Sequence, residues 1–241
     1  NIANKFIFYF LLIKGILLMK LAICFYGYPR FYETGYQTTK KLYEGCDLEY
    51  YANFWGDGKE LDQITSLFNF KKIEMQPQVE KFKEISCNPN LSKTSKDLFT
   101  TISPLYSIQK LHNLIKESDE DYDFWILTRT DIGVDFDFYL NSLEYDKTKI
   151  YSSYVRGNEW LNTHIDTKFI MCDKKNILNL TNIYENLDYY ICNKNIPLCH
   201  HRLFFNSLLE YGSDMEMIMA NPNDDYAGGW RWIRNNEMKI S

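Results

Sequence analysis

The sequence lacks the spaced cysteine pairs that mark zinc proteins and heavily cross-linked domains. Its six cysteines are scattered over 241 residues without a single Cys-x-x-Cys, so we expect reduced thiols and a cytoplasmic protein. A Cys-His-His run at residues 199–201 resembles part of a zinc site, but no second group of ligands lies at zinc spacing. We therefore favour ordinary packing and surface roles for this run.

Concentrated positive charge is missing too. The chain has 27 Lys and Arg against 32 Asp and Glu, a formal net charge of -5, which argues against nucleic acid as a partner but not against a nucleotide as a small ligand. No GxxxxGK[ST] loop occurs, so a phosphotransferase or nucleotidyltransferase ranks low among the candidates. No G-x-S-x-G occurs either, and Ser-His-Asp hydrolysis finds no support.

A long apolar run is the third missing feature. The stretch FIFYFLLIKGILL, residues 6–18, falls short of the ~20 residues that span a bilayer and contains Lys14. Met19 and Lys20 stand directly before a strand-like pattern. We interpret residues 1–18 as an upstream extension or a short apolar anchor at the inner face of a membrane, and residues 19–241 as a single domain.

Aromatic and apolar residues are abundant, with 19 Tyr, 16 Phe and 45% hydrophobic residues overall, as expected for a folded globular protein. Apolar periodicity predicts alternating strands and helices. The expected strands are residues 21–25, 46–55, 70–74, 124–129, 149–155 and 167–173, and the expected helices are residues 33–45, 60–67, 103–118, 174–187 and 198–212. This order predicts an α/β fold with a mostly parallel central sheet flanked by helices. We expect Ser103 to cap the third helix and Pro104 to occupy its first position.

The stretch DYDFWILTRTDIGVDFD, residues 121–137, is the first candidate site. Its apolar strand ends in Arg129, Asp131, Asp135 and Asp137, and charges of this kind belong where a strand leaves the core. Two interpretations of Asp131 stay open: a structural role, as an ion pair with Arg129 or a cap of the turn, or a ligand of Mn²⁺ or Mg²⁺. Asp135 and Asp137 form a D-x-D and are either metal ligands or part of a solvated loop.

The turn YGYPRF after the first strand is the second candidate. In open α/β sheets, ligands bind beyond the carboxyl ends of the strands. Gly27 would let the backbone approach a ligand there, and Arg30 would pair with a phosphate.

The segments MKLAICFYGYPRF, SPLYSIQKLHNLI, YDFWILTRTDI and DTKFIMCD, in this order, resemble glycosyltransferases of the GT-A type. These are bacterial and large-virus proteins with a Rossmann-like nucleotide-diphospho-sugar transferase fold, and the resemblance covers residues 19–212. It implies that Gly27 and Arg30 lie at the nucleotide and that Arg129 and Asp131 lie near the diphosphate, bound through Mn²⁺ or Mg²⁺. Here the strand ends in R-x-D where the family has D-x-D, so the need for a metal stays open.

We therefore expect a hexosyl- or related transferase that moves a sugar from a nucleotide-diphosphate donor to a glycan or polysaccharide acceptor. An inverting enzyme needs a carboxylate to accept the acceptor's proton, and our first candidate is Asp166, ahead of Glu159, Asp224 and Asp225. Asp166 is otherwise a turn-capping residue. The GGWRW segment, residues 228–232, either stacks on a sugar or base ring or packs back onto the core. The alternative to an enzyme is a carbohydrate-binding or interaction protein that kept the fold without catalysis.

Overall fold

The computed structural model describes residues 18–89, 98–134, 138–153, 155–156, 164–165, 167–218, 230–234 and 237–239. The strands are β1 (Lys20–Gly27), β2 (Asp47–Trp55), β3 (Phe70–Gln76), β4 (Phe124–Thr128), β5 (Ile132–Val134), β6 (Ile150–Ser152), β7 (Val155–Arg156), β8 (His164–Ile165), β9 (Phe169–Cys172), β10 (Met215–Met217), β11 (Trp230–Arg234) and β12 (Glu237–Lys239). The α-helices are α2 (Tyr32–Thr39), α3 (Leu61–Leu67), α4 (Leu98–Lys116), α5 (Lys174–Thr181) and α6 (His200–Glu210), and shorter helical turns cover Leu140–Ser142 and Tyr189–Asn193.

Seven strands form the central sheet in the order β10-β6-β9-β4-β1-β2-β3. The pairs β1/β2, β1/β4, β2/β3 and β6/β10 are parallel, and β9 runs antiparallel to both of its neighbours. This confirms the predicted α/β fold with a mostly parallel sheet. Two smaller sheets, β12-β11-β5 and β7-β8, accompany it.

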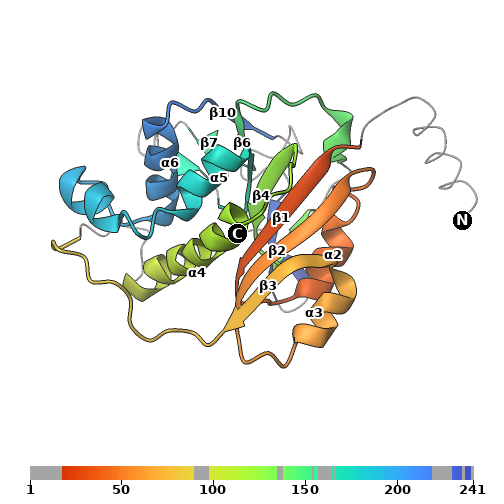
Figure 1. Ribbon diagram of the computed structural model, residues 1–241, viewed down its shortest axis with the longest axis horizontal. Helices are drawn as coiled ribbons and strands as arrows, with labels where there is room; N and C mark the ends of the chain where they lie inside the picture. The colour runs from red at the N-terminus through yellow and green to blue at the C-terminus, as the bar shows by residue number, and fades with distance from the viewer. Residues whose placement is uncertain are drawn as a thin grey trace, which may run out of the picture.

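Helices cover both faces of the sheet, as Figure 1 shows for α4, α5 and α6 on one face and α2 and α3 on the other. Side chains alternate between the faces along a strand. In β1, Ala22 and Cys24 pack under α4, while Leu21 and Ile23 pack on the opposite side. Because neither face of β1 or β4 meets water, both strands read as almost continuous apolar runs in the sequence.

The order of the strands reverses at β1. From β1 the chain moves outward through β2 and β3, and then returns through α4 to place β4 on the other side of β1. Ligands of doubly wound sheets bind at such a reversal, beyond the carboxyl ends of the strands. The β1 turn and the residues that follow β4 both lie at this edge.

Several predicted bounds are wrong. Helix α4 begins at Leu98, so Pro104 lies inside the helix and Ser103 is not its N-cap. Proline in a helix costs a hydrogen bond, but burial of Thr101 and Ile102 holds the earlier turn against the core. The helix expected at 33–45 ends at Thr39. The strand expected at 149–155 is divided into β6 and β7, and the helices expected at 174–187 and 198–212 end at Thr181 and Glu210.

The expectation that all thiols are reduced is also wrong, because Cys87 and Cys192 form a disulfide. This bond connects the segment after β3 to the turn after α5, and it closes a separation of 105 residues. Two hydrogen bonds support the same contact: the Lys83 N–H donates to the Tyr184 hydroxyl at 2.8 Å, and the Ser86 N–H donates to Asp188 at 2.9 Å. The disulfide therefore lies in an ordered interface.

The interpretation of residues 1–18 falls almost wholly outside the described residues, which begin at residue 18. Within the described part of the chain, no helix combines the length and the apolar character needed to cross a bilayer.

Candidate functional site

Two adjoining cavities lie at the carboxyl edge of the sheet, where the strand order reverses. The smaller one, called here the turn cavity, has a volume of about 200 Å³ and is lined by Tyr26, Gly27, Tyr28, Arg30, Trp55, Gln78, Phe99, Thr100, Ser103, Pro104 and Arg129. The larger one, called the histidine cavity, has a volume of about 350 Å³ and is lined by Tyr26, Thr100, Pro104, Ile108, Arg129, Thr167, Lys168, His200, His201 and Phe204. The two cavities adjoin, because Tyr26, Thr100, Pro104 and Arg129 line both of them.

The β1 turn forms one wall of the turn cavity. Gly27 adopts φ +86°, a conformation that side chains disfavour. Its N–H donates to the Ser107 hydroxyl at 2.8 Å, and that hydroxyl donates to the Asn53 carbonyl at 3.2 Å. Ser107 is fully buried, so α4 fixes the ends of β1 and β2 together.

Arg30 supplies an exposed positive charge at this wall. Its guanidinium carbon lies 5.2 Å from the centre of the Tyr28 ring, within cation–π range. No carboxylate of the described residues pairs with Arg30, whereas the other cation in the turn cavity, Arg129, is held by Asp131. The turn cavity thus presents an accessible guanidinium beside aromatic rings, as an anionic, ring-bearing ligand requires.

Arg129 and Asp131 form a two-bond ion pair directly after β4. The Arg129 Nε donates to Oδ1 of Asp131 at 2.8 Å, and Nη2 donates to Oδ2 at 2.7 Å. The Asp131 side chain is fully buried and that of Arg129 is 16% exposed. Burial lowers the pKa of Arg129, but the hydrogen bonds and the charge of Asp131 outweigh this effect, so the pKa lies above its ordinary value.

The backbone of residues 129–131 is held from three sides. The Thr130 hydroxyl donates to the Arg30 carbonyl at 3.0 Å, which ties this turn to the β1 turn. The Ile233 N–H donates to the Asp131 carbonyl at 2.9 Å, because β11 pairs with β5. On the third side Gly35 of α2 packs against Thr130 so closely that a Cβ at this glycine would lie 1.9 Å from the Thr130 carbonyl oxygen.

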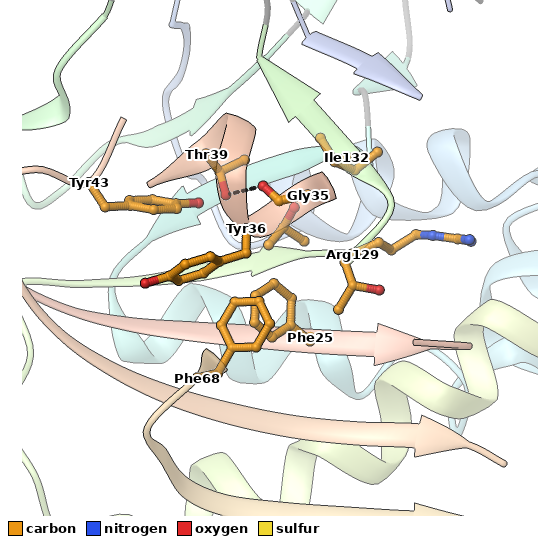
Figure 2. A pocket seen from close by; sticks show the side chains of 10 residues that line it. Phe25, Gly35, Tyr36, Thr39, Tyr43, Phe68, Arg129 and Ile132 are labelled. Atoms are coloured by element: carbon orange, nitrogen blue, oxygen red, sulfur yellow. Dashed lines mark hydrogen bonds between the residues drawn. The ribbon is translucent and has the colours of Figure 1, made fainter. Parts of the chain in front are cut away.

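Figure 2 shows a small cavity next to Gly35. Phe25, Tyr36, Tyr43 and Phe68 surround a small cavity beneath Gly35, and the guanidinium of Arg129 points away from these rings. The cavity has a volume of only about 10 Å³, which is about the space of one water molecule. It is therefore a packing space, and Arg129 is directed toward the two larger cavities that it lines.

Replacing Gly35 with alanine should destabilise the protein by about 3 kcal/mol, near the upper end of typical overpacking costs. The added methyl group meets main chain, which cannot move aside as a flexible side chain would. Urea unfolding would measure the loss, with Thr38→Ala in the same helix as the control. A Gly35→Ala protein as stable as the Thr38→Ala protein would show that α2 can move away from Thr130 at no cost.

The histidine cavity carries a different set of groups. Lys168 lines it although the residue is only 7% exposed. The Thr128 hydroxyl donates to the Lys168 carbonyl at 2.7 Å, and the Tyr26 hydroxyl donates to the Thr167 carbonyl at 3.2 Å. These bonds anchor the start of β9 to β4 and β1. His200 and His201 at the start of α6 also line this cavity, and their ring centres lie 4.1 Å apart.

The described residues do not fit a metal ion. Both oxygens of Asp131 accept hydrogen bonds from Arg129, and Asp131 lines neither of the two larger cavities. Within the ranges that the structure describes, no group of three His, Cys, Asp or Glu side chains gathers at ligand distance, including the Cys-His-His run. Asp135 and Asp137 lie outside the described residues. Metal binding by Asp135 and Asp137 therefore stays a prediction, whereas Asp131 is held in its ion pair with Arg129.

The structure brings Gly27, Arg30 and Arg129 together at one edge of the sheet, with Asp131 behind Arg129. The candidate base Asp166 and its alternatives Glu159, Asp224 and Asp225 lie outside the described residues. Residues 230–232 of the GGWRW segment pair with β5 through the main chain, as expected for a segment that packs back onto the fold.

Sequence reasoning missed Ser107 and Lys168. Ser107 stands directly before the apolar Ile108 in the α4 segment. A polar residue within a buried apolar stripe needs a hydrogen-bond partner, and this was the signal that could have identified Ser107. Lys168 immediately precedes β9. Its position at the cavity follows from the antiparallel direction of that strand, which local sequence does not specify.

No protein-family model and no curated protein matches the chain. Among solved structures, the chain is similar to the apo form of the glycosyltransferase GlyE from Streptococcus pneumoniae, with a TM-score of 0.47 and 11% sequence identity. The match covers 83% of this chain and 45% of that chain. This chain thus spans less than half the length of that structure, and a likeness at this level carries no conclusion about activity.

Proposed function

We propose that the chain is a glycosyltransferase that uses a nucleotide-diphospho-sugar as donor and a glycan or polysaccharide as acceptor. The observation that carries the proposal is the pair of adjoining cavities at the reversal of strand order, with Arg30 in the turn cavity and Arg129 in the lining of both. The turn cavity, with Tyr28 and Trp55 beside Arg30, would hold the nucleotide. The histidine cavity has the volume for a sugar.

Arginine has a clear role in such a reaction. Transfer from a nucleotide diphosphate builds positive charge at the anomeric carbon and negative charge on the leaving phosphate. Arg129 lines both cavities, so it would lie near the bond that breaks, and its guanidinium is already oriented by Asp131. An oriented cation stabilises developing charge without a cost of reorganisation. Proton transfer by Asp166 and a contribution of Mn²⁺ or Mg²⁺ through Asp135 and Asp137 remain parts of the proposal.

A thermal-shift screen tests nucleotide binding. The chain would be melted with UDP, GDP, CMP and their sugars, each with and without Mn²⁺, because a ligand of the native state raises the melting temperature. We expect one nucleotide class to raise it. No shift with any of them at millimolar concentration would contradict the proposal.

Arg30→Ala should weaken binding of that nucleotide about tenfold or more, since a hydrogen bond to a charged group contributes about 1.5–3 kcal/mol. Arg30 is exposed, so the fold should be unaffected. Calorimetric titration would measure the change. The matched control is Lys175→Ala, an exposed cation of α5 that lines neither cavity. Equal affinity in the two variants would remove Arg30 from the site.

A second candidate function is carbohydrate binding without catalysis. It is favoured by the ion pair that occupies both oxygens of Asp131. Binding of glycans without any binding of nucleotide sugars would support it over the enzyme.

A further inference from the structure

The turn cavity extends across the ends of four neighbouring strands. In the sheet these strands follow one another as β4, β1, β2 and β3. Each contributes a lining residue at or just after its end: Arg129 for β4, Gly27 for β1, Trp55 for β2 and Gln78 for β3. Neighbouring strands lie about 4.8 Å apart, so the ends of β4 and β3 are about 14 Å apart across the sheet. Along this row, Arg129 and Gln78 are the outermost of the four.

A nucleotide that lies along this row has its two ends in different surroundings. Both arginines of the cavity, Arg30 and Arg129, follow the strands on one side of the row, β1 and β4, so the phosphates belong there. The base then extends past Trp55 toward Gln78. The edge of a base that lies farthest from the ribose carries C4 of a pyrimidine or C6 of a purine. Uracil and guanine have a carbonyl oxygen at this position, whereas cytosine and adenine have an amino group.

Gln78 offers one specific hydrogen-bonding group to that edge. Its Oε1 accepts a hydrogen bond from the Tyr28 hydroxyl, which orients the amide with Nε2 turned away from Tyr28. Among the described residues, no acceptor takes a hydrogen bond from Nε2. A side chain that lines the cavity thus has an unused donor. A donor pairs with a carbonyl oxygen but not with an amino group.

The chain holds Gln78 in place from both sides. Two residues earlier, at the end of β3, the Gln76 side-chain amide donates to Oδ1 of the fully buried Asn53 at 2.9 Å. Later in the same segment, the ring of Phe82 packs against that of Phe99 in α4, with ring centres 5.3 Å apart. A side chain on a fixed segment discriminates between ligands better than one on a loose segment.

We infer that Gln78 determines which base the nucleotide carries. Its Nε2 donates a hydrogen bond to the carbonyl oxygen at C4 of a pyrimidine or C6 of a purine, so that keto bases are preferred over amino bases. Tyr28 is a positioning residue, because its hydroxyl holds the amide of Gln78 in the donating orientation. The inference rests on the proposed function, in which the turn cavity holds the nucleotide.

Calorimetric titration with two matched pairs of nucleotides tests the inference: UDP against CDP, and inosine diphosphate against ADP. The members of each pair differ only in the keto or amino group at this edge and in the accompanying proton on the ring nitrogen. We expect the keto member of at least one pair to bind about tenfold or more tightly, because a donor that faces an amino group leaves both groups unpaired. The pair that binds more tightly shows whether the base is a pyrimidine or a purine.

Two variants assign the preference to the amide. Gln78→Glu keeps the shape of the side chain but replaces the donor with an acceptor, so the preference for the keto base should disappear or reverse. The added charge repels the phosphates of both members of a pair equally, so the ratio of their affinities is the readout. Tyr28→Phe keeps the ring and frees the amide to rotate, and it should lower the same ratio.

Gln63→Glu is the matched control. Gln63 of α3 accepts a hydrogen bond from the Tyr32 hydroxyl at 2.6 Å, as Gln78 does from Tyr28, but it lines neither cavity. This variant should keep the wild-type ratio.

Three results would overturn the inference while leaving nucleotide binding intact: equal affinity within both pairs, tighter binding of the amino members, or a keto preference that survives in Gln78→Glu. If Gln78→Glu fails to fold, an unchanged ratio in Tyr28→Phe overturns it in the same way. If none of the four diphosphates binds, the inference and the proposed function both fail.

Discussion

Asp131→Ala is expected to lower the stability of the fold by about 3–5 kcal/mol, the usual cost of removing one partner from a buried ion pair. The Asp131 side chain is fully buried, and both of its oxygens accept hydrogen bonds from Arg129. For a chain of this size, the melting temperature should fall by roughly 6–20 °C. Thermal unfolding followed by circular dichroism would measure it.

Glu216→Ala is the matched control, because it removes one carboxylate from the exposed pair with Lys149. Exposed pairs contribute about 0–1 kcal/mol, so this variant should melt close to the wild type. If Asp131→Ala melts like Glu216→Ala, the ion pair does not hold the turn, and Asp131 becomes available as a metal ligand.

Loss of activity in Asp131→Ala would not by itself identify Asp131 as a metal ligand. Loss of sugar-nucleotide turnover in Asp131→Ala would follow from a displaced Arg129 as well as from a lost metal ion. Asp131→Asn separates the two, since the amide oxygen still accepts one hydrogen bond from Arg129 and the side chain keeps its volume. If Asp131→Asn is active without added metal whereas Asp131→Ala is inactive, the role of Asp131 is to position Arg129.

Loss of the disulfide is the second large expected effect. Reduction of the disulfide, or replacement of Cys192 with serine, should lower the free energy of unfolding by about 2–5 kcal/mol. The bond joins residues 105 apart, and cross-links that close long loops constrain the unfolded chain most in the chain-entropy account, by about 4–5 kcal/mol for a loop of this length. Melting curves with and without dithiothreitol measure this cost directly.

The wild type should lose stability in dithiothreitol, and Cys192→Ser should be insensitive to it. Cys46→Ser is the control, because Cys46 is a free and partly buried thiol. The disulfide would be contradicted if the wild-type melting temperature were the same with and without the reductant, and if the unfolded, untreated protein had six titratable thiols.

The disulfide holds a segment that also contributes to the turn cavity. Gln78, near the start of the segment between β3 and α4, lines the turn cavity and accepts a hydrogen bond from the Tyr28 hydroxyl. Cys87 holds the later part of this segment against the turn after α5. Nucleotide affinity should therefore be compared in oxidised and reduced protein.

The sheet was predictable because its central strands are buried on both faces. Leu21, Ile23 and Ile126 face one layer of helices, while Cys24 and Leu127 face the other, so β1 and β4 stand out as uninterrupted apolar runs. Charged residues at the end of such a run also located Arg129 and Asp131 at the edge of the sheet. The local pattern alone carried this information.

Other features depend on partners far away in the chain. The pairing of Cys87 with Cys192 joins residues 105 apart, and the sequence shows neither partner as special. The extension of α4 through Pro104 follows from burial of the preceding turn against the sheet, which overrides the local preference of proline. Glycine is a poor helix former, yet the lack of a side chain at Gly35 is what lets α2 reach Thr130.

We expect a nucleotide to bind beyond the carboxyl ends of β1 and β4. The most direct test is a crystal structure of the chain grown with UDP, GDP or CMP, whichever gives the largest thermal shift. We predict phosphate oxygens within hydrogen-bonding distance of Arg30 or Arg129, with the base against Tyr28 or Trp55. A nucleotide bound away from both arginines, or no nucleotide at millimolar concentration, would contradict the assignment of this edge of the sheet as the donor site.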